Sequence, residues 1–255
     1  MNKNFPWSIK YDPNSDKPFI MSRSKIDLYL KCKRCAYLDM RLGIKGPKPF
    51  PYNLNSRIDA LLKNEHDLAR TKKIKTKYLE ESNINAIPFA HVELDVWREP
   101  FKAARYHHKE ANIIVAGSVD DLWENLDTKK IHIVDYKSTH TDKFDKLKSF
   151  DAPYLISYKR QAEIYSWILS KLGLDIDNTS YFFYVNAKPE QEIFKNNLEF
   201  EYAIIPYKTK DYNWVENTIV KIKNFLETNK IPTSTQDCAL CKYMSKFFEF
   251  IKKKN

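Results

Sequence analysis

Glycine is scarce in this sequence, which contains four glycines among 255 residues. Loops that cradle phosphate groups need glycine, because their backbone turns sharply and comes close to the ligand. The sequence contains neither GxGxxG nor GxxxxGK(S/T). The serine motif GxSxG is also missing. These absences argue against nucleotide-driven chemistry, dinucleotide-dependent chemistry and a serine nucleophile on a strand-to-helix turn.

Long apolar runs are missing as well. No stretch approaches the ~20 apolar residues that a membrane-spanning helix needs. The segment 1–20 is polar and interrupted by proline, without the apolar core of a signal peptide. We therefore expect a cytoplasmic protein with no membrane partner.

Basic side chains outnumber acidic ones. Lysine and arginine total 43 against 33 aspartates and glutamates, a formal net charge of +10. A partner that carries many phosphates would favour this excess, because basic side chains displace the counterions condensed on nucleic acid. A lysine-rich solvated surface is the alternative explanation, and the net charge alone leaves both open.

Hydrophobic periodicity predicts an α/β protein. Since no internal repeat occurs, we expect a single domain over 1–255 that begins with an irregular arm at 1–20. One predicted helix begins near Ser24, and the others cover 56–72, 157–172 and 211–228. The predicted strands cover 89–97, 113–123, 131–138, 181–186 and 201–206. This order predicts a central mixed β-sheet flanked by helices rather than a repeating βαβ fold.

The most informative segment is Gly117-Ser-Val-Asp120 followed by Asp135-Tyr-Lys137. Side chains alternate along a strand, so Asp135 and Lys137 share one face of the strand 131–138. If that strand neighbours the one before it, Asp120 and Asp135 converge and offer oxygen ligands to Mg²⁺ or Mn²⁺. Lys137 could then orient a water molecule or stabilise charge on a phosphate. A buried ion pair that only supports the fold is the alternative.

Two helices carry further candidate residues. The apolar stripe predicted for helix 56–72 consists of Ile58, Leu61, Leu62, Leu68 and Ala69. Glu65 falls in the middle of this stripe, where burial of a carboxylate suggests a metal or a partner charge. His66, at the boundary of that stripe, is the alternative ligand. Gln161 and Tyr165 lie four residues apart on one face of helix 157–172. They could contact a nucleic-acid strand or could simply belong to the core.

The four cysteines form two C-x₂-C pairs, Cys32 with Cys35 and Cys238 with Cys241. In a reducing compartment such pairs indicate a metal site rather than disulfides. Four thiolates can bind Zn²⁺ or an iron–sulfur cluster. Such a site would join the segments 22–40 and 230–245.

Taken in order, these motifs resemble those of the PD-(D/E)xK nuclease superfamily, specifically its RecB-like branch. That signature is a helical acid or histidine, then GxxD, (D/E)xK and QxxxY. Here it corresponds to Glu65 or His66, Asp120, Asp135 with Lys137, and Gln161 with Tyr165. The resemblance implies a restriction-endonuclease-like core over 52–228 and a Mg²⁺- or Mn²⁺-dependent deoxyribonuclease, with exonuclease action as the expectation.

The resemblance also implies roles for these residues. Asp120 and Asp135, with Glu65 or His66, would ligate the catalytic metal. Lys137 would act beside it, and Gln161 and Tyr165 would contact DNA. Related nucleases with a cysteine clasp carry a [4Fe–4S] cluster, which we expect here, with Zn²⁺ as the alternative.

By the same resemblance, the pathway would be DNA repair, recombination or CRISPR-type DNA processing. DNA is the expected partner, and a helicase subunit could accompany it. A non-catalytic nucleic-acid-binding module, or an interaction subunit of a helicase–nuclease assembly, is the alternative function.

Overall fold

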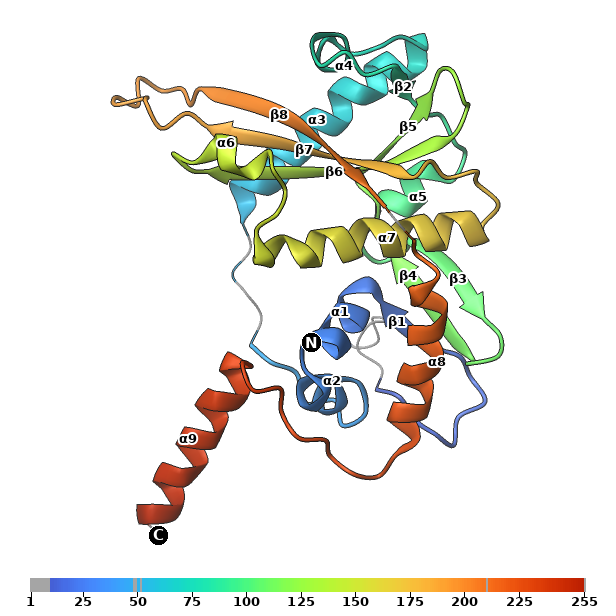
Figure 1. The fold of residues 1–255 in the computed structure, drawn as a ribbon, viewed down its shortest axis with the longest axis vertical. Coiled ribbons are helices and arrows are strands. Elements are labelled where there is room, and N and C mark those ends of the chain that lie inside the picture. The colour runs from blue at the N-terminus through green and yellow to red at the C-terminus, as the bar shows by residue number, and fades with distance from the viewer. Residues whose placement is uncertain (1–9, 48–49, 51, 210, 255) are drawn as a thin grey trace. The chain divides into compact units, whose positions relative to one another are not determined.

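The computed structural model describes residues 10–47, 50, 52–209 and 211–254 (Figure 1). These residues form two compact units. The first comprises 10–47, 105–116 and 213–254, and the second comprises the described residues of 50–104 and 117–212. The irregular arm predicted at 1–20 lies partly outside the described residues, and the expectation of one domain over 1–255 stays a prediction.

The first unit is built around a three-stranded sheet in the order β1-β4-β3, in which β1 and β4 run parallel. The ring of Phe225 packs edge-on against Tyr29 and Tyr37, so the last long helix before the cysteine pair is joined to the first two helices. The elements of this unit are β1 (Phe19–Ser22), α1 (Arg23–Lys31), α2 (Lys33–Met40), most of β3 (Ala104–His108) and β4 (Ile113–Gly117), α8 (Trp214–Glu227) and α9 (Ala239–Lys254).

The second unit contains a five-stranded sheet in the order β2-β5-β6-β7-β8. The pair β6–β7 is parallel and the other pairs are antiparallel, so the sheet is mixed. Its strands are β2 (Ala86–Pro88), β5 (Asp121–Asn125), β6 (Ile131–His140), β7 (Thr179–Ala187) and β8 (Phe200–Lys208). Its helices are α3 (Asn53–Lys72), α4 (Lys77–Glu81), α5 (Leu94–Arg98), α6 (Phe144–Leu147), the 3₁₀ helix Pro153–Leu155 and α7 (Ile156–Lys171).

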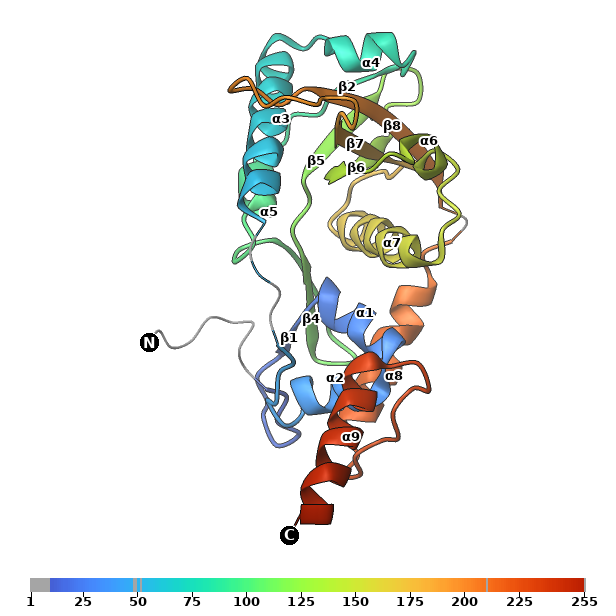
Figure 2. The same cartoon turned by 90° about the vertical axis from the view of Figure 1, so that its left-hand side faces the viewer.

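Helices cover both faces of this sheet, with α3 on one face and α7 on the other (Figure 2). Val134 and Tyr136 of β6 join the core cluster that contains Leu62 of α3. In β7, Phe182 and Tyr184 join the cluster that contains Ala162 of α7. Since Asp135 and Lys137 pair in register with Phe182 and Tyr184, their side chains lie on the α7 face. The predicted fold class, a mixed sheet flanked by helices, is confirmed.

Two of the predicted strands differ from the structure. The strand predicted at 89–97 is wrong, because β2 ends at Pro88 and most of that segment is a loop followed by α5. Val92, Leu94 and Val96 alternate with polar residues as in a strand, but Leu94 and Trp97 are the buried pair, at helical spacing. The strand predicted at 113–123 is interrupted after Gly117, and β5 begins at Asp121.

No helix of the described residues is long and apolar enough to span a membrane.

The close packing of Gly117 predicts a stability effect. A Cβ atom added there would overlap Cε1 of Tyr165. We expect Gly117→Ala to lower the free energy of unfolding by about 1–3 kcal/mol through overpacking, measured by urea denaturation. The double variant Gly117→Ala/Tyr165→Leu should show less than the summed loss. Strict additivity of the two single effects would contradict this packing account.

Candidate active site and cysteine cluster

Asp120 directly precedes β5, and Asp135 lies in the neighbouring strand β6. The antiparallel register of β5 and β6 pairs Asp121 with Val134, so Asp120 directly precedes the paired segment beside Asp135. Asp120 is held in place because its Oδ2 accepts a hydrogen bond of 3.0 Å from the backbone N–H of Tyr136. The two carboxylates thus belong to adjacent positions at the same end of the β5–β6 pair.

Gln161 and Lys137 hold the carboxylate of Asp135 on the α7 face. Nε2 of Gln161 donates to Asp135 Oδ1 over 2.6 Å and lies 3.3 Å from the hydroxyl oxygen of Tyr165. The ammonium of Lys137 forms an ion pair with the other oxygen of Asp135 and lies 4.7 Å from the ring centroid of Tyr158. The sequence prediction that these residues form one group is therefore geometrically consistent, while their catalytic roles stay proposals.

Lys137 is kept charged by its surroundings. Burial disfavours the ammonium form, but the carboxylates of Asp135 and Asp120 outweigh burial and raise the pKa of Lys137 above its ordinary value. A positive charge is thus fixed between two carboxylates. Such a group can stabilise negative charge that develops on a phosphate.

Helix α3 adds two residues that the sequence analysis missed. Nζ of Lys63 lies 2.8 Å from Asp59 Oδ2 and 3.4 Å from Asp120 Oδ1, so it bridges the two carboxylates. Burial, together with the nearby charge of Asp120, raises the pKa of Asp59 despite the opposing effect of Lys63. Asp59 is therefore the helical acid next to Asp120. Its four-residue spacing from Lys63 is the sequence signal that could have identified the pair.

The structure does not place Glu65 and His66 beside Asp120 and Asp135, where the sequence analysis expected one of them. The carboxylate of Glu65 accepts a hydrogen bond of 2.9 Å from the hydroxyl of Tyr78, and at ~100° per residue Glu65 lies about opposite Lys63 on α3. His66 is fully buried, and its ring stacks on Trp123 at a centroid distance of 5.6 Å.

The residues of α3 that are buried explain why the prediction for Glu65 differs from the structure. Its buried residues are Leu62, His66 and Ala69, whereas Leu61 and Leu68 are exposed. The predicted stripe counted both exposed leucines as core, which displaced its centre onto Glu65. His66 is the residue that faces the sheet, on the side opposite Asp135. Its Nε2 has no hydrogen-bond partner among the described residues, and burial lowers the pKa of His66.

Asp121, next in the chain to Asp120, has a different environment. It is fully buried, and its oxygens accept hydrogen bonds from Arg70, from Arg98 at 2.8 Å and from the Tyr136 hydroxyl at 2.7 Å. Asp67 binds the same two arginines. This network occupies the carboxylate of Asp121, so Asp120 is the member of the pair that remains partly exposed beside Asp135.

The donor set fits a hard divalent cation. Asp59, Asp120 and Asp135 offer carboxylate oxygens, the ligand type that Mg²⁺ and Mn²⁺ prefer. Lys63 and Lys137 make ion pairs with these carboxylates and partly neutralise their charge. In the described part of the chain, three or more potential ligand atoms gather within 4.8 Å only at the cysteines. A cation shared by the three carboxylates would therefore draw them closer together.

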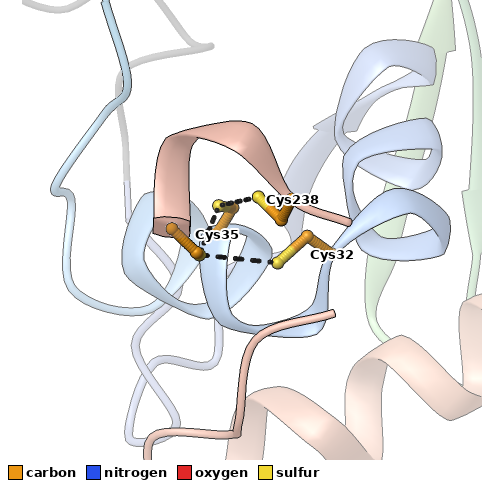
Figure 3. A group of neighbouring side chains, drawn as sticks. Cys32, Cys35 and Cys238 are labelled. Carbon is orange, nitrogen blue, oxygen red and sulfur yellow. Dashed lines mark hydrogen bonds between the residues drawn. The ribbon is translucent and has the colours of Figure 1, made fainter. Parts of the chain in front are cut away.

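The four cysteines gather in the first unit. Figure 3 labels three of them, Cys32, Cys35 and Cys238. Sγ of Cys35 lies 3.5 Å from Sγ of both Cys238 and Cys241, and Sγ of Cys32 lies 3.8 Å from Sγ of Cys241. All four cysteines are free. The predicted approach of the N- and C-terminal cysteine segments is confirmed, and the group could bind a metal.

Each C-x₂-C pair begins a helix. Cys32 is the N-cap of α2, and Cys238 directly precedes α9. Burial alone would raise the pKa of Cys32, but backbone N–H groups of Cys35 and Thr235 and the neighbouring thiols lower it to about 6. Burial raises the pKa of Cys241 to about 11. When no cation is bound, these pKa values therefore favour one ionised cysteine in the cluster rather than four.

A comparison with models of known protein families identifies the family of this chain. The model of the PD-(D/E)XK nuclease superfamily matches residues 20–245. The chain belongs to the PD-(D/E)XK nuclease superfamily. Enzymes of this superfamily are nuclease-type hydrolases that use divalent metals. The branch within the superfamily is not specified by the match.

Two further comparisons add nothing to the family assignment. No curated protein matches this PD-(D/E)XK chain. A solved structure described as "Crystal structure of SSO0001" aligns with 87% of the chain and 82% of its own chain, at 13% identity and a TM-score of 0.34.

The geometry predicts that Asp59, and not Glu65, contributes to divalent metal binding. We expect Asp59→Asn to weaken Mn²⁺ binding roughly tenfold or more, because a carboxylate beside Asp120 loses its charge. Glu65→Gln, on the opposite side of α3, should leave the affinity unchanged. Isothermal titration with Mn²⁺ measures both, and the reverse order of effects would restore Glu65 as the helical ligand.

The cysteine cluster predicts a second metal dependence. We expect Cys238→Ser to remove most of the metal that copurifies with the chain and to lower the melting temperature, because metal binding and folding are coupled at such sites. Elemental analysis and thermal unfolding measure these effects. Ser234→Ala, in the segment before the cysteine pair, is the control and should retain the metal. Unchanged metal content in Cys238→Ser would exclude the cluster as the binding site.

Proposed function

We propose that this chain is a Mg²⁺- or Mn²⁺-dependent deoxyribonuclease that hydrolyses phosphodiester bonds. The observation that carries the proposal is the placement of Asp120, directly before β5, beside Asp135 and Lys137 of the neighbouring β6 in a PD-(D/E)XK nuclease chain. Asp59 of α3 completes the group of carboxylates.

Each residue of this group has a distinct proposed role. Asp59, Asp120 and Asp135 would hold the divalent metal, which when bound acts as a Lewis acid and activates water. Gln161 fixes one oxygen of Asp135 by its hydrogen bond, and the hydroxyl of Tyr165 supports the Gln161 amide. Gln161 and Tyr165 are thus positioning residues behind Asp135. Contact with DNA remains a further proposal for both.

Lys137 has the environment of a charge-stabilising group. Its ammonium stays protonated beside Asp135 and Asp120, where it could reach a phosphate held by the metal that these carboxylates would bind. Lys63 provides a second positive charge beside Asp59 and Asp120. Two ammonium groups at one site suit an anionic substrate that gains charge in the transition state.

The proposed branch of the superfamily rests on the order of the motifs, and the proposed substrate rests on the net charge. The succession of a helical acid, GxxD, DxK and QxxxY supports the RecB-like branch, and the net charge of +10 supports a nucleic-acid substrate. We propose DNA as that substrate and exonuclease action as the mode. DNA repair, recombination and CRISPR-type processing remain the proposed pathways, with a helicase subunit as a proposed partner.

The direct test is cleavage of end-labelled DNA with Mn²⁺ or Mg²⁺. We expect cleavage to stop with EDTA and to fall by roughly hundredfold or more in Asp135→Asn and in Lys137→Met. Asp145→Asn is the matched control, because Asp145 is an exposed carboxylate paired with Lys148 and should keep full activity. DNA binding without cleavage in the wild type, at saturating Mn²⁺, would favour the non-catalytic alternative.

For the cysteine site we propose one tetrahedral Zn²⁺ rather than the [4Fe–4S] cluster that the resemblance suggested. A Zn–S distance of about 2.3 Å in a tetrahedron separates the sulfurs by ~3.8 Å. The shorter Sγ distances here are 3.5 and 3.8 Å. A four-iron cluster places one iron in front of each thiolate and requires wider spacing.

Spectroscopy distinguishes the two metals. We expect anaerobically purified protein to contain about one zinc per chain and to lack visible absorbance. A broad brown absorbance band with about four iron atoms per chain would contradict the zinc proposal and support the cluster.

A further inference from the structure

Helix α9 leaves an unusually large apolar surface exposed. Six of its residues, Tyr243, Met244, Phe247, Phe248, Phe250 and Ile251, are 39–66% exposed. Among the described residues of α9, only Cys241 in the first turn is buried. Figure 1 shows α9 attached at its first turn, beside α2, with the rest of the helix extending away. Contiguous apolar patches of this kind mark interaction surfaces rather than ordinary solvated faces.

The helix is divided into an apolar and a basic face. At ~100° per residue, the six residues and Leu240 occupy an arc of about 160° that only Lys254, the last residue of α9, interrupts. Lys242, Lys246 and Lys253 lie on the opposite face, and Lys246 is the nearest of them to the border at Phe250. Lys252 lies near the border at Phe248. Glu249 is the one acidic residue of α9. The apolar arc therefore has lysines near both of its borders.

The lysines of α9 favour one of the partners that could cover this apolar arc. A second copy of α9 would bring lysines at the borders of one arc against lysines of the other, which repel. A nucleic acid would attract the lysines but would leave the aliphatic and aromatic arc exposed to water. An anionic lipid surface satisfies both faces, because half of the helix can sink among the acyl chains while lysines at the borders reach the headgroups.

The breadth of the arc favours a lipid surface over a protein groove. A groove usually receives a narrow line of anchors spaced at i, i+3, i+4 and i+7. Here both borders of the arc carry phenylalanine, Phe248 on one side and Phe250 on the other. A strongly basic face, a broad aromatic face and modest overall hydrophobicity are the properties of helices that lie in the membrane interface.

We propose that α9 is an interfacial helix that binds the chain to an anionic lipid surface. The earlier expectation of no membrane partner rested on the absence of a spanning segment, which does not bear on a helix that lies on the surface. The cysteine cluster fixes the first turn of α9 through Cys238 and Cys241, so the exposed turns begin at a defined anchor.

The test uses the full chain with its cysteine metal bound. Vesicles of three parts phosphatidylcholine to one part phosphatidylglycerol are compared with vesicles of phosphatidylcholine alone by flotation. We expect binding to the anionic vesicles to be roughly tenfold tighter or more, and to weaken as salt is raised. Equal binding to both vesicles, or binding to neither, would overturn the proposal.

Variants separate the helix from the general charge of the protein. We expect the double variant Phe247→Ser/Ile251→Ser to abolish flotation while nuclease activity and melting temperature stay unchanged. Lys252→Gln/Lys253→Gln should weaken flotation roughly tenfold. Lys129→Gln/Lys130→Gln, a pair of exposed lysines in the turn before β6, is the matched control and should bind as the wild type does.

Two outcomes would contradict the lipid assignment directly. If the control pair weakens flotation as much as Lys252→Gln/Lys253→Gln, the attraction is nonspecific and α9 has no special role. If analytical ultracentrifugation shows a dimer that Phe247→Ser/Ile251→Ser dissociates, and the wild type does not float, α9 pairs with a second copy instead.

Discussion

Mutual repulsion among carboxylates is the constraint on which the second unit depends. Asp59, Asp120, Asp121 and Asp135 lie around one end of β5 and β6, where burial strengthens the repulsion between like charges. The chain offsets it in two ways. Arginines neutralise Asp121 permanently, whereas lysines neutralise the three carboxylates that remain beside the candidate metal site.

That division has a functional consequence. Arg70 and Arg98 are held between Asp67 and Asp121, and the Tyr136 hydroxyl adds a further hydrogen bond, so this network has little capacity left for a ligand. Lys63 and Lys137 carry compact ammonium groups on flexible stems, which can change partner when a cation or a phosphate arrives. This end of the sheet therefore combines a rigid arginine network with lysines that can change partner, and the lysines belong to the site for which we propose catalysis.

Much of this arrangement could be predicted from the sequence. Alternation along the strand 131–138 placed Asp135 and Lys137 on one face, and helical spacing placed Gln161 beside Tyr165; the structure has both. Asp59 was missed because it lies near the polar border of an amphipathic helix, where an acid ordinarily faces water. Its proximity to Asp120 depends on how α3 is rotated against the sheet. That rotation is set by Leu62, His66 and Ala69, and periodicity alone could not separate them from the exposed leucines.

The central claim is that Asp59, Asp120 and Asp135 share one divalent cation. The most direct measurement is the anomalous difference density of Mn²⁺ in crystals of the protein grown with that ion. The account predicts a peak bound by oxygens of all three carboxylates, with the ammonium of Lys63 displaced from between Asp59 and Asp120. A peak bound by Glu65 or His66, or the absence of Mn²⁺ from this end of β5 and β6, would contradict it.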